Sequence, residues 1–363
     1  MRIFLYEFVT GGGLLCAGEA PVGSLLQEGS AMMAALAEDL NCLPPVDLHW
    51  MCDQRFIEEN HRPPYPGTVH WVQDAEEEAA TFQQLSAASD WTIVIAPEIN
   101  GHLIRRCEMV KEVGGQLLGP SLQALRLTAD KQQTIEYLKC QGISVPEGHF
   151  VPAETPIPSD FGFPAVCKPI DGAGSVGIVW IESAKHALAV GTDRCARRLE
   201  RYCPGLPVSV AFLCSTTDCI GLPPFRQFIE RKAGFAYRGG QGPLEPGLSG
   251  RASKLAWKVV TCLPPLLGYV GVDLILGPAA DGSEDVIIEI NPRITTSYVG
   301  LRVLSEQNLA EVMLDVALGN STPLSFRGET LQFWADGLVQ SSMPPREDAL
   351  TKYRKASGKK SRA

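Results

Sequence analysis

Residues 286–293 read Val286-Ile287-Ile288-Glu289-Ile290-Asn291-Pro292-Arg293, and Gly271-Val272-Asp273-Leu274-Ile275-Leu276 comes shortly before them. Both segments are short and apolar, which predicts two strands, and residues 277–285, rich in Gly, Pro, Ala and Asp, predict the turn between them. Because side chains alternate along a strand, Glu289 and Asn291 are expected on one face, with Ile288 and Ile290 on the other. A polar pair therefore projects from an otherwise apolar sheet.

These polar side chains form a candidate metal site. Asp273, on the neighbouring strand, can add a third oxygen to those of Glu289 and Asn291. Hard oxygen ligands suit Mg²⁺, with Mn²⁺ as the alternative, held mostly through nucleotide phosphates. Arg293 is expected at the edge of this site. The competing interpretation of Asp273 is an acidic residue that faces solvent, as in many antiparallel sheets.

A glycine-rich run lies between two other apolar segments. Residues 163–181 contain Gly172-Ala173-Gly174-Ser175-Val176-Gly177, and the apolar residues on either side predict strands. This strand–loop–strand context excludes the dinucleotide-binding fingerprint, and no G-x-x-x-x-G-K-[ST] motif occurs. The backbone N–H groups of such a hairpin can fold over phosphates, and Lys168 before it adds a positive charge. A hairpin with a purely structural role is the alternative.

The first 120 residues alternate predicted strands and helices. This alternation predicts a small parallel sheet covered by helices. Residues 50–71, which contain three prolines, are expected to form a loop. The predicted strands are residues 2–9, 91–96 and 116–119, and the predicted helices are residues 24–40, 76–88 and 103–113.

Four residues near the ends of these strands are candidates for substrate binding. Glu7, Gly12 and Glu28 surround the turn Thr10-Gly11-Gly12-Gly13, and Glu98 follows the strand at 91–96. In open α/β sheets, ligands lie beyond the carboxyl ends of the strands. The carboxylates can hold a substrate ammonium group, and the glycines allow a close backbone approach. Surface carboxylates and a merely tight turn are the alternatives.

The sequence also predicts the secondary structure of three later segments. Residues 121–141 are predicted as one helix with Lys131 at its middle, and residues 184–201 as an amphipathic helix. Residues 233–250 contain Gly-Gly-Gln-Gly-Pro next to Tyr237 and are predicted as a long irregular loop. Such loops in compact domains are usually functional or mobile, and we expect this one to act as a lid.

Composition limits the class of protein. A chain of 363 residues predicts two or three domains. The net charge of −9 argues against general nucleic-acid binding, and no apolar run reaches the length of a membrane span. Eleven cysteines without a C-x-x-C pair, including Cys167, Cys214 and Cys262 in apolar segments, predict buried thiols in a reducing cytoplasm. The basic residues 341–363 are expected to be disordered.

Taken in order, several of these features resemble the ATP-grasp superfamily over residues 1–325. The resemblance implies an ATP-grasp fold of mixed α/β and α+β type, in which two α+β lobes hold ATP. The implied parts are a Rossmann-like α/β pre-ATP-grasp domain (1–120), a small lobe with the glycine loop (121–205) and a C-terminal lobe (206–335). The features are Lys131, Lys168-Pro169, the glycine run, Tyr202-Cys203-Pro204-Gly205, Asp273 and Glu289-Ile290-Asn291-Pro292-Arg293.

The same resemblance assigns roles in the ATP site. The two lysines are expected on the phosphates, the glycine loop over them, and the Tyr202 turn at the adenine as a hinge. Pro207 departs from the pattern, because many relatives have an acidic residue for the ribose there. Arg201, with Glu200 before it, stands where an acidic residue often precedes the hinge aromatic. The expected ATP-binding residues are Lys131, Lys168, Gly172, Gly174, Ser175, Gly177, Tyr202 and Cys203.

Four shorter segments are most similar to the tyramine–glutamate ligase branch of the superfamily. They are residues 96–101, 128–131, 235–240 and 291–298. Enzymes of this branch act in the synthesis of methanofuran, a one-carbon carrier. The resemblance implies an acid–amine ligase that forms C–N bonds between small-molecule substrates, here glutamate and either tyramine or tyrosine.

The implied reaction has two steps. A carboxylate oxygen attacks the γ-phosphate of ATP to give an acyl phosphate, and an amine then displaces phosphate to form an amide. Mg²⁺ at Asp273, Glu289 and Asn291 would neutralise phosphate charge. Arg293, whose guanidinium matches two oxygens, is expected to act in catalysis together with Lys168.

Several alternatives remain open at this point. Glu7, Glu28 and Glu98 are equal candidates for deprotonating the amine, and Tyr237 or Tyr298 can stack on an aromatic amine or be ordinary half-buried tyrosines. Competing functions are a peptide-type or purine-pathway ligase, a nucleotide-binding module without catalysis, and a nucleic-acid binder that uses the basic tail. The favoured interpretation has no nucleic-acid or membrane partner, and a homodimer is one option for its assembly.

Overall fold

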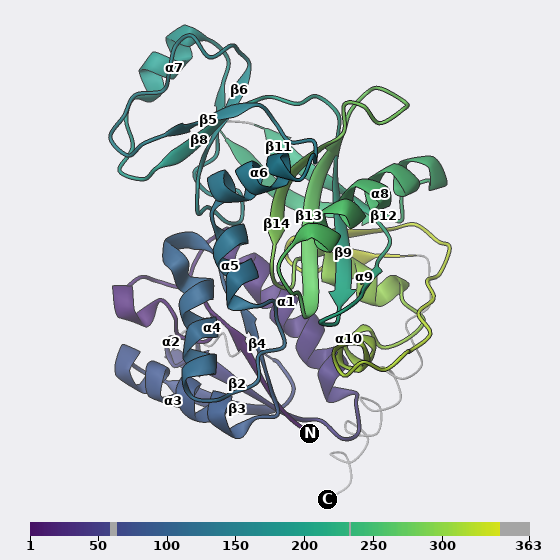
Figure 1. Cartoon of the computed structure of the whole chain (residues 1–363). Coiled ribbons are helices and arrows are strands. Elements are labelled where there is room, and N and C mark those ends of the chain that lie inside the picture. Colours follow the sequence, from purple (N-terminus) through teal and green to yellow (C-terminus); the bar gives the residue numbers. More distant parts are fainter. Residues whose placement is uncertain (59–63, 232–233, 342–363) are drawn as a thin grey trace, which may run out of the picture.

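Three β-sheets follow one another along the chain in a computed structural model, which describes residues 1–58, 64–231 and 234–341 (Figure 1). The strands are β1 (Arg2–Glu7), β2 (Asp47–Asp53), β3 (Thr68–Val72), β4 (Trp91–Ile95), β5 (Gly148–Val151), β6 (Ala165–Pro169), β7 (Val179–Ile181), β8 (Arg197–Arg201), β9 (Leu206–Cys214), β10 (Cys219–Gly221), β11 (Phe225–Arg231), β12 (Phe235–Gly242), β13 (Gly268–Leu276), β14 (Val286–Asn291), β15 (Leu331–Trp334) and β16 (Val339–Gln340). The α-helices are α1 (Ser24–Asn41), α2 (Arg55–Glu58), α3 (Ala75–Ala88), α4 (His102–Glu112), α5 (Leu122–Ala129), α6 (Lys131–Cys140), α7 (Ala184–Val190), α8 (Pro246–Cys262), α9 (Ser297–Leu304) and α10 (Leu309–Ala317), and two short 3₁₀ turns are Leu15–Ala17 and Ile99–Gly101.

The first sheet is parallel and has the order β3-β2-β1-β4, as the alternating strands and helices predicted. Its central strand β1 is apolar and almost completely buried, because helices cover both faces of a parallel sheet. The prediction of a loop at residues 50–71 is wrong for the described part, since β2 and β3 lie there. Their pairing with β1 comes from the tertiary fold, which the prolines between them do not reveal.

The second sheet is small and antiparallel, with the order β5-β8-β6-β7. The predicted helix at 184–201 is correct only for α7, because Gly191 has a left-handed φ of 73° and residues 197–201 form β8. Arg197 and Arg198 on this strand are almost fully buried. Inside the small lobe, Arg198 pairs with Glu200 (2.7 Å) and Arg197 donates to Thr155 O (2.8 Å).

The helix predicted at 121–141 is two helices, α5 and α6. Asp130 separates them, because its backbone is extended and its side chain accepts a hydrogen bond from Gln133 N at the start of α6. Lys131 therefore begins α6 instead of lying in the middle of a longer helix. Its backbone N–H donates to Ile170 O (2.8 Å), which ties α6 to the glycine loop.

The third sheet has eight strands in the order β14-β13-β9-β11-β12-β15-β16, with β10 paired to β9. One face packs on α8, and the other packs on α1, α9 and α10 in a core shared with the N-terminal sheet. The first two predicted parts each contain one sheet, and the predicted C-terminal lobe (206–335) contains the third sheet except for β16. The boundaries themselves remain a prediction. Figure 1 shows α1 lying between the parallel sheet and the α9–α10 side of the large lobe.

The predicted lid at 233–250 is wrong for its described part. Residues 235–242 form β12, which pairs with β11 and β15 inside the large sheet, and α8 begins at Pro246. Gly239, with a φ of 131°, lets β12 approach β15 closely, so the glycines serve strand packing and not a mobile loop. Residues 232–233 and the predicted basic tail at 342–363 lie outside the described residues.

The prediction of buried thiols needs two corrections: Cys16, Cys140 and Cys195 are exposed, and two other cysteines are paired. Cys214 and Cys219 face each other across the β9–β10 pair and form a disulfide. Cys167 is a buried free thiol, as predicted, whereas Cys262 is only partly buried. Among the helices of the described residues, none is both long and apolar enough to cross a membrane.

Candidate active site

The β13–β14 hairpin forms one wall of the site. Asp273 lies opposite Glu289, and Gly271 lies opposite Asn291. A β-bulge shifts the register here and turns Ile288 toward the cavity, whereas Ile290 packs into the core. The prediction that Ile288 shares the core face with Ile290 is therefore wrong, because the bulge interrupts the alternation of side chains between the two faces of the strand.

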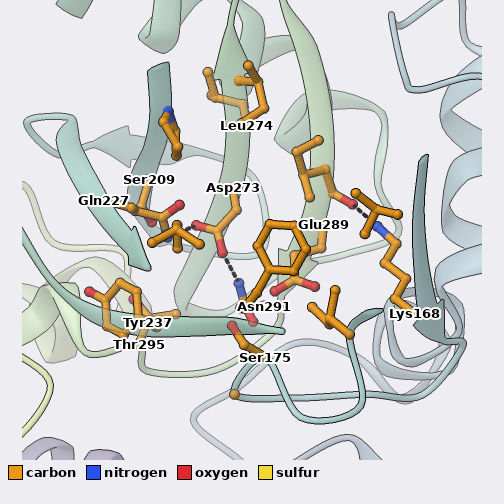
Figure 2. A pocket seen from close by; sticks show the side chains of 18 of the residues that line it. Lys168, Ser175, Ser209, Gln227, Tyr237, Asp273, Leu274, Glu289, Asn291 and Thr295 are labelled. Atoms are coloured by element: carbon orange, nitrogen blue, oxygen red, sulfur yellow. Dashed lines mark hydrogen bonds between the residues drawn. The ribbon is translucent and has the colours of Figure 1, made fainter. Parts of the chain in front are cut away.

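An acidic pair, Asp273 and Glu289, lies in this wall (Figure 2). Asp273 accepts hydrogen bonds from Asn291 Nδ2 (3.0 Å) and Gln227 Nε2 (3.1 Å). Burial raises the pKa of Asp273 well above its usual value, and the charge of Glu289 raises it further. Burial also acts on Glu289, but nearby lysines outweigh it and lower the pKa of that carboxyl.

The acidic pair fits a divalent cation. Two carboxylates facing each other away from water repel, and a cation between them would relieve that repulsion. The Asn291 amide donates through nitrogen to Asp273, so its oxygen remains available as a ligand. Within residues 1–58, 64–231 and 234–341, no three His, Cys, Asp or Glu side chains form a metal cluster. This suits Mg²⁺, which takes one or two carboxylates and fills its other positions with water and phosphate oxygens.

Two lysines lie beside the acidic pair. Lys168 Nζ is 2.7 Å from Glu200 Oε2 and 3.4 Å from Ile288 O, and Lys131 Nζ is 3.3 Å from Glu289 Oε2. Lys131 also donates to Gly172 O of the glycine loop. Both ammonium groups therefore lie where the small lobe meets β14, and Lys168 also lines the cavity described below.

Glu200 is a partner that sequence reasoning did not assign. It is buried, and its second oxygen accepts from Arg198 Nε at 2.7 Å. The Arg-x-Glu spacing on β8 places both side chains on one face of a strand. That signal is present in the sequence, but only if residues 197–201 are first recognised as a strand.

The glycine loop connects β6 and β7, which pair antiparallel as predicted. Gly174 (φ 59°) and Ser175 (φ 61°) have left-handed backbones and line the cavity. Gly172 and Gly177 do not line it: Gly172 O binds Lys131, and a Cβ at Gly177 would lie only 2.9 Å from Pro169 Cγ. These two glycines shape the turn and leave Gly174 and Ser175 to face a ligand.

The cavity measures about 440 Å³ and lies between the two ATP-grasp-like lobes and α1. We call one side the hinge end, formed by Pro146, Val166, Tyr202, Cys203 and Ile275, and the other the arginine end, formed by Glu28, Met32, Tyr237, Arg293 and Thr296. The acidic pair lies between them: Figure 2 shows Leu274 on one side of Asp273 and Tyr237 with Thr295 on the other.

The hinge end is a mostly apolar slot. Tyr202 and Cys203 both line it, as predicted, and Tyr202 N donates to Pro164 O (3.1 Å), which fixes the turn to the small lobe. Pro207 lines the cavity where an acidic residue is common in relatives. Arg231 of the cavity wall stacks on Trp180, which lies outside that wall, with the guanidinium carbon 4.1 Å from the ring centre, and so joins β11 to the small lobe.

Arg293 dominates the arginine end. Its Nε and Nη2 donate to the two oxygens of Glu98 (3.0 and 2.9 Å), and its Nη1 donates to Ile294 O (3.2 Å). A guanidinium has five N–H bonds, so two remain on the Nη1–Nη2 edge. Glu98 thus orients Arg293 and leaves that edge for two oxygens of a ligand.

The other substrate candidates divide into two groups. Glu28 and Tyr237 line the cavity. Gly12 does not, since its backbone packs against Val72. Tyr298 is fully buried and donates to Asp39 Oδ2 (2.8 Å), so the prediction that it stacks on a substrate is wrong. Glu7 is buried under α1 and accepts from Thr10 N (2.7 Å) and Val9 N (3.1 Å).

Several cavity residues were not predicted. Gln227 holds Asp273, and the hydroxyl side chains after Arg293 form the floor of the arginine end. No motif marks them, because they come from strands and turns that only the folded sheet brings together. The unpredicted residues in the wall include Met32, Ser209, Gln227, Ile229, Arg231, Phe235, Thr295, Thr296 and Ser297.

Comparison with known proteins agrees with this arrangement. A family model for the ATP-grasp domain matches residues 128–297, and one for the pre ATP-grasp 3 domain matches residues 46–125. The fold is also that of the carboxyaminoimidazole ribonucleotide synthase of Aspergillus clavatus, solved with ATP (TM-score 0.66, 19% identity, 91% of this chain and 80% of that one). Since the two models together extend over most of the chain, it belongs to the ATP-grasp superfamily.

Within the superfamily the chain lies near the tyramine–glutamate ligase branch. It is 29% identical over 244 residues to the tyramine–L-glutamate ligase of Methanocaldococcus fervens, which covers 67% of this chain and 71% of that protein. The tyramine–L-glutamate ligase of Methanocaldococcus jannaschii is 28% identical over 240 residues, 66% of this chain and 67% of that protein.

Proposed function

We propose that this ATP-dependent carboxylate–amine ligase joins L-glutamate to tyramine, in the synthesis of a methanofuran-like one-carbon carrier. The observation that carries the proposal is the cavity lined by Lys168, the acidic pair and Arg293, with Lys131 paired to Glu289 in its wall. The similarity to two tyramine–L-glutamate ligases supports the choice of substrates.

ATP is a substrate of this reaction, with its adenine in the hinge end. Tyr202 and Cys203 would bound the base, and the backbone N–H groups near Gly174 and Ser175 would cover the phosphates. Lys131 and Lys168 would place their positive charges on the phosphate oxygens and stabilise the charge that develops as the γ-phosphoryl group is transferred.

Mg²⁺ bound by Asp273, Glu289 and Asn291 would neutralise phosphate charge during that transfer. The protein's own part is to aim both carboxylates and to keep Glu289 ionised. Gln227 and Asn291 hold Asp273 by hydrogen bonds, and Lys131 keeps Glu289 charged.

Arg293 would bind the carboxylate that is phosphorylated. Its free Nη1–Nη2 edge matches two oxygens, and Glu98 fixes the orientation of that edge. Holding the carboxylate beside the γ-phosphate turns a bimolecular reaction into an effectively unimolecular one, which lowers the barrier. The acyl phosphate then loses phosphate when the amine nitrogen bonds to the acyl carbon.

Tyramine is favoured over tyrosine by the charges at the arginine end. Tyr237 and Met32 offer an aromatic and an apolar surface there, and Glu28 offers a carboxylate. Tyrosine would bring a second carboxylate close to Glu28, which would repel it. Tyramine has the same ring and amine without that carboxylate.

The test is ADP release by purified protein with ATP and Mg²⁺, with product masses read alongside. L-Glutamate with tyramine is expected to give ADP and a glutamyl amide of tyramine, and tyrosine is expected to react at least about tenfold more slowly. ADP release with a different acid–amine pair would keep the ligase chemistry and remove the assignment of glutamate and tyramine.

A further inference from the structure

Three carboxylates were equal candidates for taking the proton of the amine, and the structure separates them. Glu98 uses both oxygens to hold Arg293. Glu7 uses its oxygens on Thr10 and Val9 below the first strand, and it does not line the cavity. Glu28 lines the cavity, and in the described part of the chain no group hydrogen-bonds to its carboxylate.

Glu28 lies between the glycine loop and the arginine end. A Cβ built on Gly174 would lie 3.6 Å from Glu28 Oε1, so the carboxylate is directly beside the loop. On the other side, the negative charge of Glu28 raises the pKa of both Arg293 and Tyr237. A molecule held between the glycine loop and Arg293 must therefore pass next to this carboxylate.

The helix that carries Glu28 is fixed in place. Further along α1, Asp39 accepts hydrogen bonds from Tyr298 Oη (2.8 Å) and Arg302 Nη2 (2.8 Å) of α9. Met33 and Leu36 of the same helix are buried in the core shared with α9 and α10. The C-terminal lobe thereby sets the position of a carboxylate that belongs to the N-terminal domain.

We infer that Glu28 binds the ammonium group of the amine substrate and accepts its proton as the amide forms. This inference rests on the proposed function. In the step, the amine nitrogen forms a bond to the acyl carbon, the bond from that carbon to the phosphate oxygen breaks, and phosphate leaves with the electron pair. Two protons leave the nitrogen: the ammonium group gives one to a Glu28 oxygen before the attack, and the departing phosphate takes the other.

The charges around Glu28 suit this role. Burial raises the pKa of Glu28 to about 7, Arg293 lowers it and Glu289 raises it further. A base is most effective when its pKa lies near the working pH. An alkylamine is almost wholly protonated at neutral pH, as a Lys side chain is, so the reaction needs a group that removes this proton.

The experiment compares two nucleophiles in the variant Glu28→Gln. Hydroxylamine is unprotonated at neutral pH and traps an acyl phosphate as a hydroxamate, so it does not need Glu28 as a base. With tyramine, we expect kcat/KM to fall at least about 100-fold. With hydroxylamine and the same glutamate, we expect the fall to be less than about tenfold, because Glu28 would act only on the amine.

The matched control is Glu112→Gln, which makes the same change at an exposed position of α4 outside the cavity wall. It is expected to leave both rates unchanged. Glu28→Asp, which keeps a shorter carboxylate, should recover part of the tyramine rate without changing the hydroxylamine rate. Thermal unfolding of each variant then separates loss of the base from loss of the fold.

Two results would overturn the inference. Equal losses with both nucleophiles would mean that Glu28 binds glutamate or supports the fold, and no loss with either would mean that it has no role in the reaction. If the wild-type protein makes no hydroxamate from glutamate and ATP, the proposed function itself fails, and the inference fails with it.

Discussion

The hinge end and the arginine end of the cavity are built from the chain in different ways. The hinge end and the neighbouring Lys168 come from consecutive segments between Pro146 and β9, with the β13–β14 hairpin opposite. The arginine end combines α1, β12 and the turn after β14, and its central pair, Arg293 and Glu98, is separated by 195 positions.

This difference teaches which part of the site each domain controls. The groups proposed to bind ATP are held within the two lobes. The groups proposed to bind the acid and the amine depend on how the N-terminal domain docks against the C-terminal lobe. A change at the hinge end should therefore lower the rate with every acid–amine pair. A change at the arginine end should affect the acid or the amine and leave ATP binding intact.

The largest effect is expected for Lys168→Ala. Loss of a buried positive charge beside the phosphates should lower the rate of ADP release by about 10³-fold with any acid–amine pair. The variant should remain folded, because Arg198 still pairs with Glu200. Steady-state ADP release and thermal unfolding check both statements, with Lys254→Ala on the exposed side of α8 as the control. A rate near that of the wild type would show that Lys168 does not act on ATP.

A smaller loss is expected for Glu98→Gln. The amide can accept from Arg293 with only one oxygen and carries no charge, so Arg293 is held less firmly. We expect kcat to fall by about 100-fold, with KM for ATP nearly unchanged, because misplacing a binding group by about 1 Å has this cost. A rise in KM for ATP of the same size would show that the two ends are not independent.

The control for Glu98→Gln is Glu108→Gln. Glu108 also pairs with an arginine, Arg126 (2.6 Å), but Arg126 is mostly exposed and Glu108 is partly exposed. Exposed ion pairs contribute little to stability. We therefore expect no change in either rate or unfolding temperature, and a change comparable to that of Glu98→Gln would point to a general effect of charge.

The smallest effects should distinguish two tyrosines. Tyr237→Phe removes a hydroxyl at the cavity, where it bonds to Thr296, and should raise KM for tyramine by about three- to tenfold. Tyr298→Phe removes the bond to Asp39 and should lower the free energy of unfolding by about 2 kcal/mol with little change in KM. Kinetics and chemical denaturation are the two measurements. The opposite pattern would exchange the roles of the two residues.

The hinge end and the hairpin were largely predictable, because their signals are local. The β13–β14 pair, the glycine loop between two strands and Lys168 before it follow from consecutive residues. Even there, the bulge at Ile288 was not predictable, since its cause lies in pairing with β13. Residues 235–242 were misassigned because glycines in a central strand resemble glycines in a loop.

The arginine end could be predicted only as a set of open choices. Glu7, Glu28 and Glu98 all lie near strand ends. The sequence does not show which of these carboxylates already accepts hydrogen bonds from other groups of the protein. Tyr237 and Tyr298 are equally aromatic, but one faces the cavity and the other faces Asp39. These distinctions depend on the docking of α1 against α9, which is a property of the folded chain.

The central claim is that a carboxylate is activated by phosphorylation in this cavity, and oxygen transfer tests it most directly. L-Glutamate labelled with ¹⁸O in its carboxyl groups is incubated with the protein, ATP, Mg²⁺ and tyramine, and the released phosphate is analysed by mass. Attack of the carboxylate on the γ-phosphate predicts one ¹⁸O atom in each phosphate formed with amide. Amide formation with unlabelled phosphate would contradict the account.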